Sequence, residues 1–292
     1  MRRLLGLWSM VALLALAVGC PGDDDDDSAG PGDDDDDAAP LGMILEDDGV
    51  TYAGAAMIDI TPEVVETWTD LDGDGTFDGC LDDPDASGED CDETFDDVDG
   101  DGWFDALFIG GYGPMRPAQG IHDAITIRAV VLSHDAEYLA LVGMALVGLA
   151  NKRIHTARDR LAEDGFDPDH LLAAASHNHQ GPDTMGLWGN PEDFGNPVSG
   201  LIPEYQERVV DGIEQAVREA AGAMEAVTLK VGAVQMRDLD PYFNGSSFGG
   251  GNPTSKMHGM VHDIRDPVVV SDQLLVLQGL RGDDSAVFTW TN

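Results

Sequence analysis

The sequence reads LLAAASHNHQGPD over residues 171–183, where an apolar run meets a polar loop. The apolar half, 171–175, is typical of a short buried strand. The polar half begins at Ser176 and is stopped by Gly181-Pro182, residues that favour a turn. The stretch therefore predicts a strand that ends in a loop carrying two histidines.

Regular patterns continue on both sides of this stretch. Apolar and β-branched residues at 125–132 and 138–147 flank a polar turn, which predicts a β-hairpin or two adjacent strands. Further strands are expected at 52–60, 227–234, 268–280 and 286–290, and helices at 151–164 and 203–221. Because helices and strands alternate, the class predicted is α/β or α+β with a mixed sheet.

An Asp-rich segment, 69–106, interrupts the pattern and contains two copies of Asp-x-Asp-Gly-Asp-Gly-x-x-Asp. This spacing brings carboxylates round one point, and oxygen-rich flexible cages suit Ca²⁺. An EF-hand also needs a Glu at position 12, where this chain has Leu81 and Phe108. We therefore expect two structural calcium loops resembling those of thrombospondin type 3 or integrin-type repeats. Their predicted ligands are Asp70, Asp72, Asp74 and Asp78 in the first loop, and Asp97, Asp99, Asp101 and Asp105 in the second.

The N-terminus has the features of a secretory signal: Arg2 and Arg3, then an apolar run that ends in small residues before Cys20. The run is shorter than the roughly 20 residues that span a bilayer. Its end resembles a lipobox, which implies that residues 1–20 are a lipoprotein signal peptide and that Cys20 is lipidated. Residues 21–42 repeat an Asp run and are expected to form a disordered acidic tether. We expect an exported protein, lipid-anchored to the bacterial cell envelope at the periplasmic face or the cell surface.

Cysteine usage and charge add two expectations. Cys80 and Cys91 form an even pair in an exported chain, which predicts a disulfide between them. The formal net charge is -41, which argues against nucleic acid as a partner.

The loop after the strand at 171–175 carries His177 and His179, which alternate on what we expect to be extended backbone, so that both rings face one side. Neutral imidazole is a good Zn²⁺ ligand, and ligands collect at strand ends in α/β folds. The motif Ser176-His-Asn-His-Gln-Gly-Pro182 resembles the His-Thr-His-Ser-Gly-Pro motif of the neutral/alkaline, non-lysosomal ceramidases. Four earlier segments resemble other parts of that family and occur in the family's order: 53–62, 110–113, 120–123 and 127–129.

The resemblance implies that residues 43–292 are the N-terminal portion of a ceramidase-like zinc hydrolase domain. Such a domain would hydrolyse the amide of N-acyl sphingosine, with the membrane as a partner through the lipid anchor. His177 would be a zinc ligand, and His179 would stabilise the developing oxyanion. His122 is a further catalytic candidate, for which a structural hydrogen bond is an equal alternative. The family's remaining zinc ligands would follow Asn292, so we expect these 292 residues to be inactive as they stand.

Two other functions compete with this one. The chain could be a related zinc hydrolase acting on a different amide or ester. It could instead be a non-enzymatic calcium-binding surface or adhesion lipoprotein, in which the histidine motif is incidental.

Overall fold

The computed structural model describes residues 39–64, 66–81, 93–189, 199–235 and 273–292. Within these residues, seven strands form one sheet in the order β4-β3-β2-β1-β5-β6-β7. Only the β3–β4 pair is parallel, so the sheet is mixed and the α/β class is confirmed. The strands are β1 (Thr51–Asp59), β2 (Thr126–His134), β3 (Glu137–Met144), β4 (Leu171–Ala175), β5 (Glu225–Gln235), β6 (Gln273–Leu280) and β7 (Ala286–Thr291).

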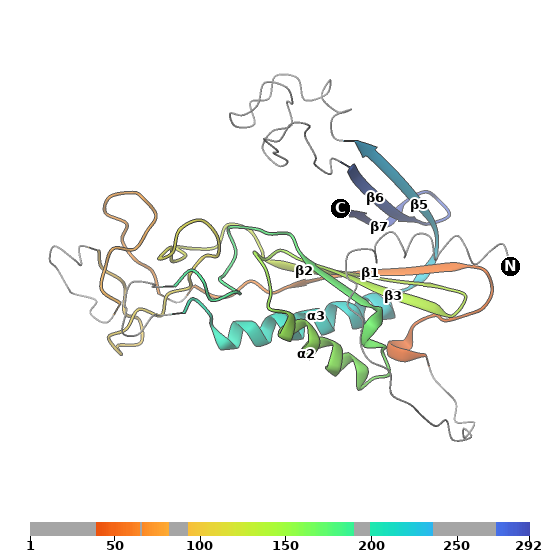
Figure 1. Cartoon of the computed structure of the whole chain (residues 1–292), viewed down its shortest axis with the longest axis horizontal. Coiled ribbons are helices and arrows are strands. Elements are labelled where there is room, and N and C mark those ends of the chain that lie inside the picture. The colour runs from red at the N-terminus through yellow and green to blue at the C-terminus, as the bar shows by residue number, and fades with distance from the viewer. Residues whose placement is uncertain (1–38, 65, 82–92, 190–198, 236–272) are drawn as a thin grey trace, which may run out of the picture. The chain divides into compact units, whose positions relative to one another are not determined.

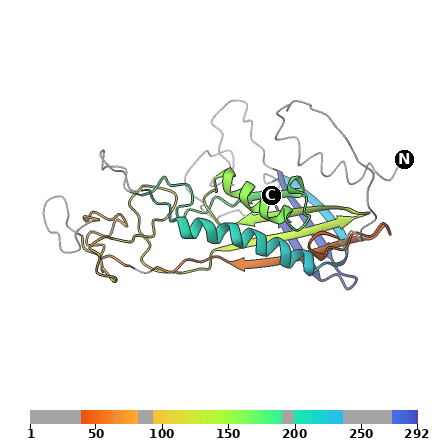
Figure 2. The same cartoon turned by 90° about the horizontal axis from the view of Figure 1, so that it is seen from below.

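Two helices, α2 (Asn151–Ala162) and α3 (Pro203–Gly222), lie on the same face of strands β1 to β3 (Figures 1 and 2). The predicted apolar stripe of α3 is confirmed, since Tyr205, Val209 and Ile213 are all buried. Alternate residues of β2, such as Ile127 and Val131, belong to the same core. Burial of this apolar face against the sheet is the main stabilising contribution to the helix layer.

The opposite face of the sheet has a smaller apolar cluster. Val130 of β2 and Leu141 of β3 pack there with Phe288 of the last strand. Trp290 also reaches β3, because a Cβ atom built on Gly143 would lie 3.4 Å from its ring. The middle of strand β2 therefore packs on both sides, which explains its unbroken apolar run at residues 129–132.

Helix α3 approaches β1 closely at Gly54, where a Cβ atom would lie 2.0 Å from the carbonyl oxygen of Ala220. We expect Gly54→Ala to lower the free energy of unfolding by about 2–3 kcal/mol, because backbone atoms must move to admit the methyl group. Chemical denaturation measures the loss. The control is Gly232→Ala in β5, where the added Cβ meets open space. An equal loss in both variants would contradict the close packing of α3 on β1.

One predicted boundary is wrong. The tether was expected to run to residue 42, but Pro40–Gly42 form a 3-10 turn, η1, whose Leu41 packs against the main core. A large apolar side chain is partly buried here, so the folded part begins earlier than charge alone suggests. The expected signal peptide, Cys20 and the Asp runs lie outside the described residues. No helix among the described residues is long and apolar enough to span a membrane.

Candidate functional site

The histidine motif directly follows β4 and runs alongside the end of β3. The amide of Ser176 donates to the Met144 carbonyl at 2.9 Å, and that of Asn178 donates to the Leu146 carbonyl at 3.1 Å. The expectation of extended backbone is wrong at His177, whose φ is 59°. The regular strand ends at Ala175, and the left-handed residue turns the chain at this point. The two rings nevertheless come together, with centroids 4.7 Å apart.

The ring of His177 is held by its Nδ1 atom, which lies 2.8 Å from the carbonyl oxygen of Val147. A carbonyl oxygen only accepts, so Nδ1 carries the proton and donates it to this bond. In a neutral imidazole, the lone pair then resides on Nε2. This is the arrangement found in metal-ligating histidines, whose second nitrogen is fixed by a backbone carbonyl or a carboxylate. His177 therefore fits the role of a zinc ligand through Nε2.

The ring of His179 rests against the segment Gly110–Gly113. Tyr112 meets it edge to face at a centroid distance of 4.9 Å, and the Arg116 guanidinium lies 5.2 Å from the Tyr112 ring centroid. The amide of Gly110 donates to the Gly181 carbonyl at 2.9 Å, which ties this segment to the motif. Two stretches about 70 residues apart in the sequence thus build one site.

Gly111 leaves the space that the His179 ring occupies. Its φ is 94°, and a Cβ atom on it would lie 2.3 Å from Cγ of His179. We expect Gly111→Ala to displace the His179 ring and to lower the free energy of unfolding by about 1–3 kcal/mol. Imidazole nitrogen chemical shifts and denaturation report the two effects. Gly113→Ala is the control, because its Cβ meets nothing within 4 Å. A displaced His179 ring in the control variant, or none in Gly111→Ala, would contradict the packing.

His122 lies apart from the paired rings of His177 and His179. Its side chain is 96% exposed, and its Nδ1 lies 2.8 Å from Oδ2 of Asp123. Within the described part of the chain, no ring contact or hydrogen bond joins it to His177 or His179. It lines a cavity of about 480 Å³ whose wall also includes Asn178 and Gln180 of the motif. The structure therefore places His122 beside the motif but not against the histidine pair.

Zinc in a catalytic site has three protein ligands as a rule. His177 and His179 supply at most two, and both are of a suitable type. Among the described residues, the groups of three or more side chains that could hold a metal ion are both acidic. The histidine pair is therefore compatible with zinc, and the described residues do not complete its ligand set.

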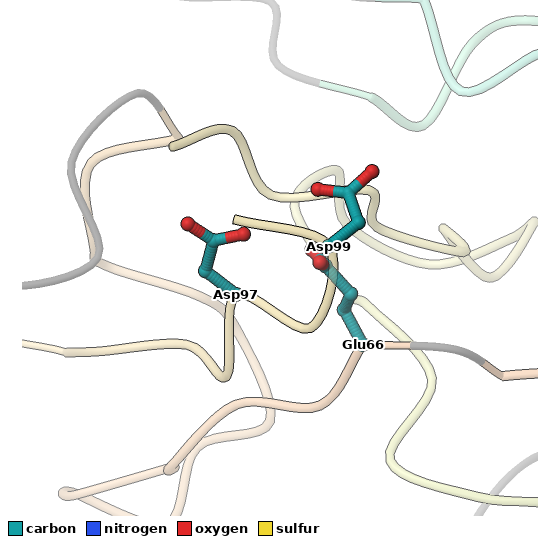
Figure 3. A group of neighbouring side chains, drawn as sticks. All are labelled: Glu66, Asp97 and Asp99. Atoms are coloured by element: carbon teal, nitrogen blue, oxygen red, sulfur yellow. The ribbon is translucent and has the colours of Figure 1, made fainter. Parts of the chain in front are cut away.

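The two acidic groups lie in the Asp-rich segment. Asp70, Asp72 and Asp74 form the first, with one ligand atom from each lying within 4.8 Å of the others. Glu66, Asp97 and Asp99 form the second by the same measure, and Figure 3 shows these three side chains converging from two segments. The other predicted ligands, Asp78, Asp101 and Asp105, are not members of either group.

The two loops have matching backbone geometry. Asp70 accepts hydrogen bonds from the amides of Gly73 and Gly75 at 2.7 and 3.1 Å. Asp97 accepts the equivalent bonds from Gly100 and Gly102 at 2.7 and 3.0 Å. All four glycines have positive φ, which explains why the repeat needs glycine at these positions.

Two buried glutamates, 2% and 3% exposed, connect the loops crosswise. Glu66 precedes the first loop but accepts from the amides of Val98 and Asp105 in the second, at 2.9 and 2.8 Å. Glu93 precedes the second loop but accepts from Leu71 and Asp78 in the first, at 2.7 and 3.0 Å. The sequence prediction missed both residues. The signal was present, because a Glu stands four positions before the first Asp in each copy.

An aromatic cluster joins the two copies into one unit. Trp68 and Phe95 lie at equivalent positions and form an antiparallel bridge. Phe77 and Phe104, also equivalent, have ring centroids 4.9 Å apart. Cys80 next to this unit is disulfide-bonded, and Cys91, its expected partner, lies outside the described residues. The insertion therefore has a small core of its own.

The charge of the second loop is poorly compensated by the protein itself. Burial raises the pKa of the Asp105 carboxyl, and the neighbouring carboxylates of Glu66 and Asp101 raise it further. A bound cation would offset this repulsion.

Comparison with solved structures identifies the fold. The structure matches the neutral ceramidase from Pseudomonas aeruginosa with a TM-score of 0.50 and 18% sequence identity, over 84% of this chain and 32% of that one. A second match, to a ceramidase complexed with C2, has a TM-score of 0.49, 16% identity, and coverage of 84% and 31%. No protein-family model and no curated protein matches the sequence. The chain spans about a third of the length of these solved structures, and at this level of identity the first match establishes the fold: a mixed-sheet α/β domain like that of neutral ceramidase.

Proposed function

We propose that this chain is part of a zinc-dependent amidohydrolase that cleaves the amide bond of N-acyl sphingosine or a related lipid amide. One observation carries the proposal: the bond from Nδ1 of His177 to the Val147 carbonyl, which leaves Nε2 available beside His179. The ceramidase-like fold supports it, because the motif lies at the end of a strand in that fold.

The chain's own residues have distinct roles in this proposal. His177 would hold zinc through Nε2. Zinc bound there would lower the pKa of a bound water to roughly 7 and polarise the amide carbonyl. His179 would donate a hydrogen bond to the oxygen that becomes negative as the amide is attacked. Tyr112 would keep the ring of His179 in position by its edge-to-face contact, and Gly111 would do so by leaving the space that the ring occupies.

Substrate comparison tests the proposal. The protein is prepared in full, with any residues that follow Asn292, and is offered an N-acyl sphingosine, an N-acyl amino acid and a long-chain ester. We expect release of the long-chain amine from the first, lost on zinc chelation and in His177→Ala. Zinc-dependent cleavage of the ester alone would favour the related hydrolase with a different substrate. Absence of cleavage from all three would contradict the proposal.

We also propose that the paired acidic loops bind Ca²⁺ and that its role is structural. The support is the gathering of carboxylates in each loop, with Glu66 in the second group. The loops share one aromatic cluster, so occupation by Ca²⁺ would stabilise the unit as a whole. This feature alone would also suit a calcium-binding surface protein. The ceramidase-like fold and the histidine pair favour the enzyme.

Membrane attachment through a lipidated Cys20 remains part of the proposal. We expect Cys20→Ser to move the protein from the membrane fraction to the soluble fraction, because a lipid chain at this residue would be the anchor. Fractionation of expressing cells with labelled fatty acid measures both location and lipidation. Label that persists in Cys20→Ser would contradict the assignment.

A further inference from the structure

The cavity beside the histidine motif is separate from the histidine pair. Its volume is about 480 Å³, within the range of small-molecule sites. Asn178 and Gln180 belong to its wall, but neither His177 nor His179 does. The motif therefore contributes to two features. It carries the paired histidine rings, and it forms part of the wall of a cavity to which the proposed chemistry assigns no role.

Part of the cavity wall is apolar. Leu107 and Ile125 are each 8% exposed, and Ile109 also belongs to the wall. Ile121, also in the wall, is 57% exposed. Such a lining favours a hydrocarbon chain, because each methylene group removed from water contributes about 0.8 kcal/mol.

The wall of the cavity carries an acidic side chain, which favours a ligand with a positive charge. Asp123 is a wall residue whose side chain is 88% exposed, so its carboxylate stands at the solvent end, where its Oδ2 lies 2.8 Å from Nδ1 of His122. The chain as a whole carries a formal net charge of -41. Both features attract a cationic head group and repel a carboxylate.

We propose that this cavity binds a long-chain amine, with the hydrocarbon chain against Leu107, Ile109 and Ile125 and the ammonium group at Asp123. The amine is one of the two products of lipid amide hydrolysis; its assignment as the natural ligand rests on the proposed function. The other product, a fatty carboxylate, has the wrong charge for this site. The cavity thus gives the amine product a place apart from the histidine pair.

Three probes of equal chain length test the charge selection: octylamine, octanoate and octanol. Calorimetry on the purified chain without zinc should show saturable binding of octylamine, about tenfold tighter than octanoate. Asp123→Asn should remove most of this preference. Its control is Asp159→Asn, which removes the same charge from the exposed surface of α2. Equal affinity for octanoate, or a preference that survives in Asp123→Asn, would overturn the proposal.

A second variant tests the apolar wall. Ile121→Ser should weaken octylamine and octanol alike by about fivefold, and it should fold, because the side chain is largely exposed. Met57→Ser is its control, since Met57 is 61% exposed and lies outside the cavity. Unchanged binding in Ile121→Ser would overturn the assignment. The binding experiments contain no zinc, so their outcome does not depend on catalysis. If octylamine binds but the substrate comparison shows no amide hydrolysis, the amine site stands and the proposed function is rejected. Hydrolysis without octylamine binding would do the reverse.

Discussion

Replacing Glu66 by glutamine is expected to loosen the second acidic loop, 97–105, and to leave the first loop, 70–78, largely intact. The reason is the crosswise hydrogen bonding, since both carboxylate oxygens of Glu66 accept amides of the second loop. In the Glu66→Gln variant one of these oxygens becomes an NH₂ group, which faces a backbone N–H as a second donor. Losing a buried hydrogen bond to a charged group costs about 1.5–3 kcal/mol, equivalent to about a 10- to 100-fold change in the local opening equilibrium.

Hydrogen exchange of the loop amides, measured with saturating Ca²⁺, resolves this effect. Val98 and Asp105 should exchange faster by the stated factor in Glu66→Gln. Glu93→Gln should act on Leu71 and Asp78 instead, because these donate to Glu93. Glu63→Gln is the control, as it removes an equal charge from an exposed position. If Glu66→Gln accelerated exchange only in the loop that follows it in the sequence, the crosswise arrangement would be wrong.

His177→Ala is expected to lower the affinity of the chain for zinc by about 100-fold or more. Loss of second-sphere partners alone reduces metal affinity by about 10- to 100-fold, and removing a ligand costs at least as much. Titration should be done with Ca²⁺ present, so that the acidic loops do not compete for zinc. His155→Ala is the matched control, because His155 is an exposed histidine of α2 that bonds only to Asn151 among the described residues.

Two results would contradict the assignment of His177. The variant and its control could bind zinc equally well, which would place the metal elsewhere. Alternatively, zinc affinity could fall equally in both, which would show that the loss of any histidine weakens zinc binding. A fall confined to His177→Ala supports the role inferred from the Val147 bond.

Local sequence patterns predicted the regular elements well. The helix expected at 203–221 is observed at Pro203–Gly222, and the strand at 171–175 is observed at the same residues. The hairpin was also correct, but the predicted turn, residues 133–137, was too long. Ser133 and His134 are polar, yet both continue β2, and Ser133 is 3% exposed because its Oγ donates to the Ile44 carbonyl at 2.6 Å. The turn itself is only Asp135-Ala136, both with positive φ.

The candidate site was less accessible to sequence reasoning, since its geometry depends on contacts between distant residues. The pairing of His177 with the Val147 carbonyl, and of Glu66 with the second loop, arises only when separate segments meet. Residue type and spacing identified the two histidines and every member of the two acidic groups except Glu66. They also indicated His122 as a candidate for the site, but not that it would line a cavity apart from the histidine pair, because its position depends on how the segments pack.

Zinc K-edge X-ray absorption on the purified chain, loaded with one equivalent of zinc in the presence of Ca²⁺, tests whether zinc binds at the histidine motif. We expect nitrogen neighbours at about 2.0–2.1 Å from zinc, with the outer scattering of imidazole. That scattering should disappear in His177→Ala and persist in His155→Ala. A spectrum with oxygen neighbours alone, unchanged in His177→Ala, would contradict the claim that the histidine motif is a zinc site.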